Sequence, residues 1–188
     1  MADTGATSLK KQEIIDQAYR LFYAGGFHAT GVDAVMADTG ISKRTLYKYF
    51  PSKEHLIEAV LAKYAGEVND MLLKPALERS SDPREQIRAL FDVRREAMDS
   101  SKCQGCLAMK AAEEYAGKHE AITAVGAQAS LYLEQCLADL CAKAGLPDPM
   151  LRGRQIGLLF QGAVQTSQVR CNTETFDAAK AVLEMLLA

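Results

Sequence analysis

The sequence has no large excess of charge of either sign. Its 22 lysines and arginines stand against 24 aspartates and glutamates, which gives a formal net charge of −2. This balance excludes a uniformly basic coat for nucleic acid, but it leaves room for a local basic patch. Hydrophobic residues make up 48% of the chain. That is enough apolar surface to offset the entropy of ordering the chain, so a globular protein is expected.

Long apolar runs are also missing. The longest uncharged stretch that is mostly apolar runs from Gln155 to Val169 and is interrupted by Gln, Thr and Ser. Because a bilayer-spanning helix needs roughly 20 predominantly apolar residues, we expect no transmembrane segment. Residues 1–8 lack the basic and apolar regions of a secretory signal. The five cysteines, an odd number, are therefore expected to be mostly reduced thiols of a cytoplasmic protein.

The alternation of apolar and polar residues that marks a half-buried strand is nearly absent, whereas helical spacing runs through the chain. The predicted fold class is all-α. Glycine, proline and capping residues predict breaks at Gly25-Gly26, Thr39-Gly40 and Pro51-Ser52, and at residues 103–105, 145–148 and 172–173. Asp82-Pro83 is predicted to begin a helix. Pro75 lies inside the fourth predicted helix and is expected to kink or end it. Thr30 and Asp33 have the spacing of a capping box, which predicts Thr30 as the cap of the second helix.

Residues 32–50 have the layout of a helix-turn-helix: a short helix, a tight turn with Gly40, and a second helix opened by Ser42. At about 100° per residue, Leu46 and Phe50 fall on one face of the second helix. Arg44, Thr45 and Lys48 fall on the opposite face, with Tyr47 and Tyr49 on the two flanks. This outward face suits a major groove with a phosphate ridge on each side.

Charge supports this interpretation locally. Residues 41–53 contain four cations, Lys43, Arg44, Lys48 and Lys53, and no acidic residue. A run of charge taken alone is usually a solvated helix face. Combined with the turn, the caps and the flanking tyrosines, the run indicates DNA binding.

The run from Ile14 to Leu61 closely resembles the N-terminal domain of TetR-type transcriptional repressors. The resemblance is carried by Gly26-Phe27, Thr30, Gly40-Ile41-Ser42, Thr45-Leu46-Tyr47, Tyr49-Phe50 and Ser52-Lys53-Glu54-His55-Leu56. It implies a helix-turn-helix domain of three helices over residues 1–52 and a larger helical domain for effector binding and dimerisation over residues 53–188. It also implies a homodimer whose recognition helices enter successive major grooves of operator DNA.

The resemblance assigns roles to individual residues in and next to the helix-turn-helix domain. Thr30, Thr45, Tyr47, Tyr49 and Lys53 would contact phosphates. Lys43 and Arg44 occupy the family's variable positions that face bases. The predicted DNA-binding set is Thr30, Lys43, Arg44, Thr45, Tyr47, Lys48, Tyr49 and Lys53, and the predicted partner is double-stranded operator DNA. Leu46 and Phe50 match buried positions of the family.

The larger domain is expected to bind an unknown small-molecule effector. Aromatic residues and methionines spread over several predicted helices are candidates for an apolar pocket: Tyr64, Phe91, Met98, Tyr115, Tyr132 and Phe160. Most such residues are core, because each helix needs a buried stripe. No cofactor, metal site or catalytic residue is predicted, so the chain is not expected to be an enzyme.

The last two predicted helices carry apolar stripes that suit a dimer interface. The predicted interface residues are Ile156, Leu159, Phe160, Ala163, Val164, Val182, Leu183 and Leu186. Gly153 and Gly157, one turn apart, would let another helix approach closely. The other interpretation is that both helices only cover their own core. Dimerisation would fix the spacing of two half-sites on DNA.

Cys103 and Cys106 have the Cys-x-x-Cys spacing, which leaves alternatives open. Cys106 at the start of a helix would be a reactive thiol, and electrophile-responsive members of the resembling family carry a similar Gly-Cys-Leu. A buried structural thiol is the more common case. In another class, a thiol redox enzyme would use Cys103 and Cys106, although its usual βαβ context is missing. A helical module for a protein partner is a further alternative. The favoured prediction is a ligand-responsive repressor, and an activator of the same type is conceivable.

Overall fold

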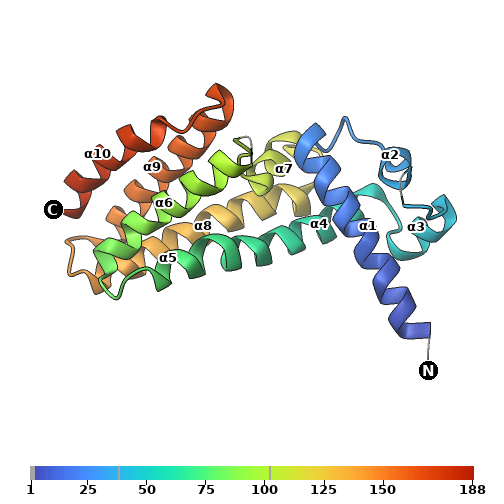
Figure 1. Ribbon diagram of the computed structural model, residues 1–188, viewed down its shortest axis with the longest axis horizontal. Helices are drawn as coiled ribbons and strands as arrows, with labels where there is room; N and C mark the ends of the chain where they lie inside the picture. Colours follow the sequence, from blue (N-terminus) through green and yellow to red (C-terminus); the bar gives the residue numbers. More distant parts are fainter. Residues whose placement is uncertain (1–2, 38, 102) are drawn as a thin grey trace. The chain divides into compact units, whose positions relative to one another are not determined.

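The computed structural model describes residues 3–37, 39–101 and 103–188, with side chains from residue 9 onward in these ranges. The helices, labelled in Figure 1, are α1 (Asp3–Gly25), α2 (Val32–Met36), α3 (Lys43–Tyr49), α4 (Lys53–Val68), a π-helical turn (Asn69–Leu73), α5 (Lys74–Glu78), α6 (Pro83–Ser100), α7 (Leu107–Tyr115), α8 (Glu120–Lys143), α9 (Pro149–Arg170) and α10 (Thr175–Leu187). None of the described residues lies in a strand, so the all-α prediction is confirmed. None of these helices is long and apolar enough to cross a bilayer.

The chain divides by its internal contacts into two compact units. Unit 1 comprises Met1–Tyr64 and Leu107–Gly126, and unit 2 comprises Ala65–Cys106 and Ala127–Ala188. The helix-turn-helix therefore shares a unit with α7 and the first turns of α8. The predicted boundary between the helix-turn-helix domain and the effector domain, at residues 52 and 53, does not coincide with the division into these two units and stays a prediction.

Aromatic and aliphatic side chains from distant segments fill the core of unit 1. Phe22 at the end of α1 packs on Phe27, with ring centroids 5.2 Å apart. Leu46 of α3 and Leu56 of α4 are fully buried beside them in the same unit. The short helices α2 and α3 both contact α1, as Figure 1 shows. Because α2 and α3 are too short to be stable alone, their position depends on this shared core.

In unit 2, α6, α9 and α10 run side by side (Figure 1). The rings of Phe91 and Phe160 meet edge to face with centroids 5.2 Å apart. Lys180 donates to Asp92 at 2.7 Å across α10 and α6. On α9, a Cβ added to Gly153 would lie 2.6 Å from the backbone nitrogen of Ala138. The close approach of another helix predicted at Gly153 is made by α8 of the same chain.

Pro75 does disturb the fourth predicted helix. It lies in the first turn of α5, directly after the π-helical turn Asn69–Leu73. Proline has no N–H to donate to the carbonyl of residue 71, and its ring crowds that carbonyl. The wider π turn before it accommodates both effects, so the chain continues in a helical path after a local distortion.

Candidate nucleic-acid interface

The turn before α3 is built by local hydrogen bonds. Ser42, in an extended conformation, accepts a hydrogen bond from the backbone N–H of Thr45 at 3.2 Å. The hydroxyls of Ser42 and Thr45 lie 2.9 Å apart and form a second hydrogen bond. Gly40 has a φ of +64°, a left-handed conformation that glycine adopts without strain. These features place the start of α3 immediately after a tight turn.

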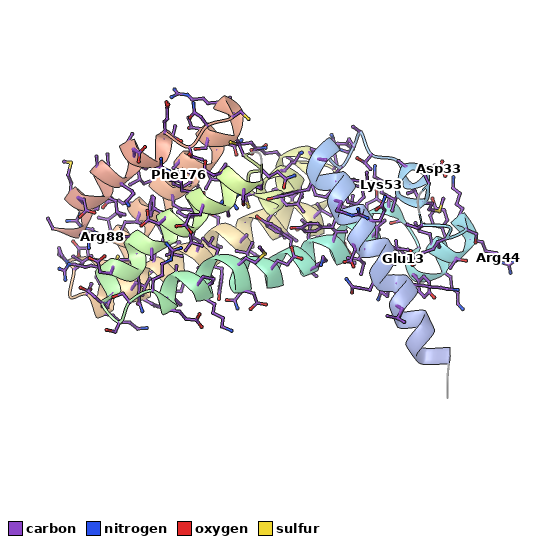
Figure 2. All side chains as sticks on the ribbon, in the orientation of Figure 1. Glu13, Asp33, Arg44, Lys53, Arg88 and Phe176 are labelled. Carbon is purple, nitrogen blue, oxygen red and sulfur yellow. The ribbon has the colours of Figure 1, made fainter. Side chains whose placement is uncertain are left out.

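α3 has one buried and one exposed face, as its sequence predicts. Leu46 is 0% exposed and Phe50, which follows the last turn, is 3% exposed. Arg44 and Lys48 are exposed, and neither makes a hydrogen bond or ion pair with any residue in the described ranges. Figure 2 shows the Arg44 side chain extending away from the ribbon. Tyr47 is 41% exposed beside them.

Lys43 is already paired in this structure. Its ammonium donates to both carboxylate oxygens of Asp33 on α2, at 2.9 and 3.2 Å. The hydrogen bond and the charge of Asp33 raise the pKa of Lys43 above its ordinary value. Both side chains are more than half exposed, so the pair opens at little cost. The cationic face of α3 is therefore weaker near Lys43 than the four cations of the sequence suggest.

Thr30 does not cap α2, contrary to the prediction. The residue at the cap position is Gly31, which makes no side-chain capping bond. Thr30 is only 8% exposed, and its hydroxyl donates to the carbonyl of Leu21 in α1 at 3.4 Å. Its position is set by packing against α1, which the local spacing could not reveal. Its phosphate contact stays a prediction.

Comparison with known proteins decides the class of this domain. Residues 14–60 match the model of the family described as "Bacterial regulatory proteins, tetR family". The match makes residues 14–60 similar to that family, and we call them the TetR-type domain. Among related proteins, an uncharacterized HTH-type transcriptional regulator YxaF from Bacillus subtilis is 35% identical over 94 residues, which are 49% of this chain and 48% of that protein. The chain thus spans about half the length of such relatives.

Solved structures of TetR-family regulators have the same fold over nearly the whole chain. The regulator SCO4454 from Streptomyces coelicolor superposes with a TM-score of 0.86, covering 96% of this chain and 97% of that one at 23% identity. A putative TetR-type regulator from Streptomyces avermitilis superposes with a TM-score of 0.81, covering 95% and 96% at 28% identity. The N-terminal helix-turn-helix followed by a larger helical part is confirmed. The curated relatives that match part of the chain are described as transcriptional regulators.

A contact that the sequence did not reveal holds the turn between α1 and α2 of the TetR-type domain. Glu114 of α7 accepts hydrogen bonds from the backbone N–H groups of Phe27 at 3.0 Å and His28 at 2.6 Å. The ring of His28 stacks on Tyr115 with centroids 4.7 Å apart. Glu114 therefore satisfies two backbone donors of the turn that follows α1. No local signal could have shown this, since the partners are 86 and 87 residues apart.

The six predicted effector-pocket residues do not form one cluster. Phe91, Met98 and Phe160 are buried in the core of unit 2. Tyr64 and Tyr115 are buried in unit 1, and Tyr132 is 57% exposed. Unit 1 has an open groove, but none of the six predicted residues lines it. The groove is lined by Thr39 and by residues of α1: Leu9, Gln12, Glu13, Asp16, Gln17 and Arg20. The pocket therefore stays a prediction.

Most of the predicted dimer residues lie inside the core of unit 2. Ile156, Phe160, Ala163, Val164 and Leu183 are at most 5% exposed within the single chain. Leu159 and Leu186 are half-buried, and Val182 is 44% exposed. A residue packed inside its own chain cannot offer its side chain to a partner. Most of the predicted interface residues therefore belong to the core of the single chain, and the dimer interface stays a prediction.

The outer face of α9 and α10 carries exposed apolar side chains. On α9 the residues at helical spacing on this face are Leu151, Gln155, Leu158, Gly162, Gln165 and Val169. Leu158 is 67% exposed, and a Cβ added to Gly162 would meet nothing within 4 Å. On α10, Val182 and Met185 are 44% and 74% exposed. We call these exposed residues of α9 and α10 the outer stripe.

The cysteines are free thiols, but two of them are neighbours. Cys106 is half-buried immediately before α7, as predicted, and its role as a sensor thiol stays a prediction. Cys171, at the end of α9, is one of the groups that raise the pKa of Cys103, so the two thiols lie near each other. The pairing that the redox-enzyme hypothesis needs, between Cys103 and Cys106, is not the one found here. No group of three or more metal-ligating side chains occurs among the described residues.

Proposed function

We propose that this protein is a TetR-type transcriptional repressor that binds operator DNA as a homodimer and is released by a small-molecule effector. A cytoplasmic location follows from that role. The proposal rests above all on one observation. In a TetR-family domain, Leu46 and Phe50 hold α3 against the core while Arg44 and Lys48 extend outward.

The chemistry of this outward face fits a major groove. An arginine donates two hydrogen bonds to O6 and N7 of guanine, the commonest base-specific contact in protein–DNA complexes. Arg44 is exposed and has no protein partner in the described part of the chain, so base contact would break no existing bond. Lys48 lies about 40° further round the helix and suits a phosphate or a neighbouring base. Tyr47 and Tyr49 supply hydroxyl donors for the flanking phosphates.

Dimerisation follows from the number of contacts that one helix can make. A single seven-residue helix reads only a few base pairs, whereas two copies related by a two-fold axis read two half-sites at a set spacing. We propose the outer stripe as the surface that joins the two copies. Effector binding in the larger helical part would favour a dimer geometry whose two α3 helices no longer match the half-sites.

The first experiment is selection of bound sequences from random DNA, followed by mobility-shift titration of the selected site with Arg44→Ala. We expect the variant to lose about 1–3 kcal/mol of discrimination between the selected site and a site with one guanine changed. Arg170→Ala, which removes an exposed arginine from the end of α9, is the matched control and should bind like the wild type. Circular dichroism checks that both variants are folded.

Two results would contradict the proposal. One is a wild-type protein that shows no preference for any DNA sequence at physiological salt. The other is an Arg44→Ala variant that keeps full discrimination at every position of the selected site, which would move base recognition to another part of α3.

A further inference from the structure

Two cysteines from distant parts of the chain meet in unit 2. Cys103 follows α6, and Cys171 ends α9. The Cys171 thiol is close enough to Cys103 to raise the pKa of Cys103. Both residues have left-handed backbone conformations, with φ of +59° and +52°, which is uncommon for residues other than glycine. A left-handed conformation is costly for an L residue, so tertiary contacts must hold both positions.

Contacts that do not involve sulfur bring the same two segments together. The hydroxyl of Thr173 donates to Asp99 at 2.8 Å, which joins the turn after α9 to the last turn of α6. Gly105 lies so close to α9 that an added Cβ would be 1.9 Å from the side-chain oxygen of Gln168. The neighbourhood of the two thiols is therefore built into the packing of unit 2.

We propose that Cys103 and Cys171 are a redox pair that closes to an intrachain disulfide on exposure to a peroxide. The Cys171 thiolate attacks one peroxide oxygen, the O–O bond breaks, and Cys171 becomes a sulfenic acid as one water leaves. The sulfur of Cys103 then attacks the sulfenic sulfur, the S–S bond forms, the S–O bond breaks, and a second water leaves. The two thiols together lose two electrons and two protons, and one hydrogen peroxide is reduced to two waters.

The exposure of Cys171 and Cys103 assigns which thiol reacts with the peroxide and which one resolves the sulfenic acid. Cys171 is exposed, so an oxidant in solution reaches it directly. Cys103 is only 8% exposed, which suits the resolving thiol. Desolvation and the nearby Cys171 thiol raise the pKa of Cys103, so Cys103 is the less reactive thiol in the first step. Cys141 is fully buried and Cys136 is half-buried on α8, and neither is paired with another thiol in the described ranges.

The test uses the full chain and needs no DNA. The protein is treated with hydrogen peroxide, remaining thiols are alkylated, and the unreduced protein is digested with trypsin and analysed by mass spectrometry. We expect one linked pair of peptides, residues 103–110 joined to 171–180, lighter than their sum by two hydrogen atoms. Reduction should separate them, and non-reducing electrophoresis should show a monomeric band.

Variants assign the link, because the first peptide also contains Cys106. Cys106→Ser should still form the linked pair, whereas Cys103→Ser and Cys171→Ser should each lose it. Cys171 is exposed, so Cys171→Ser is expected to fold, and circular dichroism confirms this. The oxidised wild type should also melt at a higher temperature than the reduced protein, since the cross-link constrains the unfolded chain. Cys171→Ser should show no such shift.

A linked pair that disappears in Cys106→Ser, or oxidation that stops at sulfenic or sulfonic acid in the wild type, would overturn the proposal. Because the linked peptides are read directly, this result does not depend on whether the protein binds DNA.

Discussion

At the scale of single residues, the charge pattern of α3 differs from what a count of cations suggests. Four cations occur between residues 41 and 53, but Lys43 is engaged by Asp33 on α2. Of the other three, Lys53 begins α4, whereas Arg44 and Lys48 lie on α3 and can bind a new partner without giving up an ion pair with any described residue. The sequence does not indicate a role for Asp33, because no sequence rule pairs residues of two helices joined by a turn.

Because Asp33 holds Lys43 in an ion pair, we predict that the Asp33→Asn variant will bind DNA more tightly than the wild type. The substitution keeps the shape of the side chain, removes an anion near the phosphates, and releases Lys43 for a phosphate or base. Because the pair is exposed, we expect the dissociation constant to fall only about twofold to fivefold. The slope of log affinity against log salt should steepen by at most about one, the value for one added phosphate contact. Fluorescence anisotropy at several salt concentrations measures both.

The Lys43→Gln variant tests whether Asp33 weakens DNA binding through its ion pair with Lys43 or through its negative charge alone. If Asp33 acts by holding Lys43, then adding Asp33→Asn to Lys43→Gln should change the affinity very little. An equal gain in both backgrounds would show that Asp33 repels DNA directly and that the ion pair has no role.

At the scale of elements, α7 is the helix whose role was least visible. Its sequence predicts an amphipathic helix and nothing more. In the structure it belongs to the same unit as the helix-turn-helix, and Glu114 binds the turn between α1 and α2. A Cβ added to Gly26 in that turn would lie 3.0 Å from the Glu114 carboxylate. The TetR-type domain therefore depends on a helix that lies far beyond residue 60 in the sequence.

We expect Glu114→Ala to loosen this turn. Two backbone N–H groups lose a charged acceptor, and the remaining acceptor for each is water. Amide hydrogen exchange of Phe27 and His28, followed by NMR, should speed up by about fivefold to tenfold, equivalent to about 1–1.4 kcal/mol. Glu113→Ala is the matched control, since Glu113 is the exposed neighbour on the same helix. Unchanged exchange in Glu114→Ala would mean that Glu114 does not hold the turn.

At the scale of the whole molecule, the outer stripe is the surface that most needs a partner. Several of its large apolar residues are more than half exposed, among them Leu151, Leu158, Val169 and Met185. A stable interface covers about 800 Å² on each partner, an area that two long helices can supply. Gly162 on the same face leaves space for close approach of a second helix. Under the proposed function, in which two copies read two half-sites, a second copy of the chain is the expected partner.

A charge placed in the outer stripe should therefore break the dimer. We expect Leu158→Glu to shift the protein from dimer to monomer in sedimentation analysis at micromolar concentration, and to weaken operator binding with it. Met71→Glu is the matched control, because Met71 is 68% exposed against 67% for Leu158 but lies in the π-helical turn. A wild-type monomer, or a Leu158→Glu dimer as stable as the wild type, would argue against this surface.

Local rules located most of the helices. Gly25-Gly26, Gly40, Ser42 and Asp82-Pro83 end or begin helices as predicted, because capping and turn preferences act over a few residues. The same rules were misleading at Thr30, where a buried contact with α1 outweighs the capping spacing.

The amino-acid sequence by itself determined the helical class, the helix-turn-helix and the faces of α3, since each depends on spacing within a few turns of one segment. Only the tertiary structure decided which neighbours those segments have: Asp33 beside Lys43, Glu114 on the turn after α1, Cys171 against Cys103, and Ile156 inside rather than on the surface. The physical reason is that an apolar stripe is equally suited to its own core and to a partner. Which one it meets depends on packing between segments far apart in the chain.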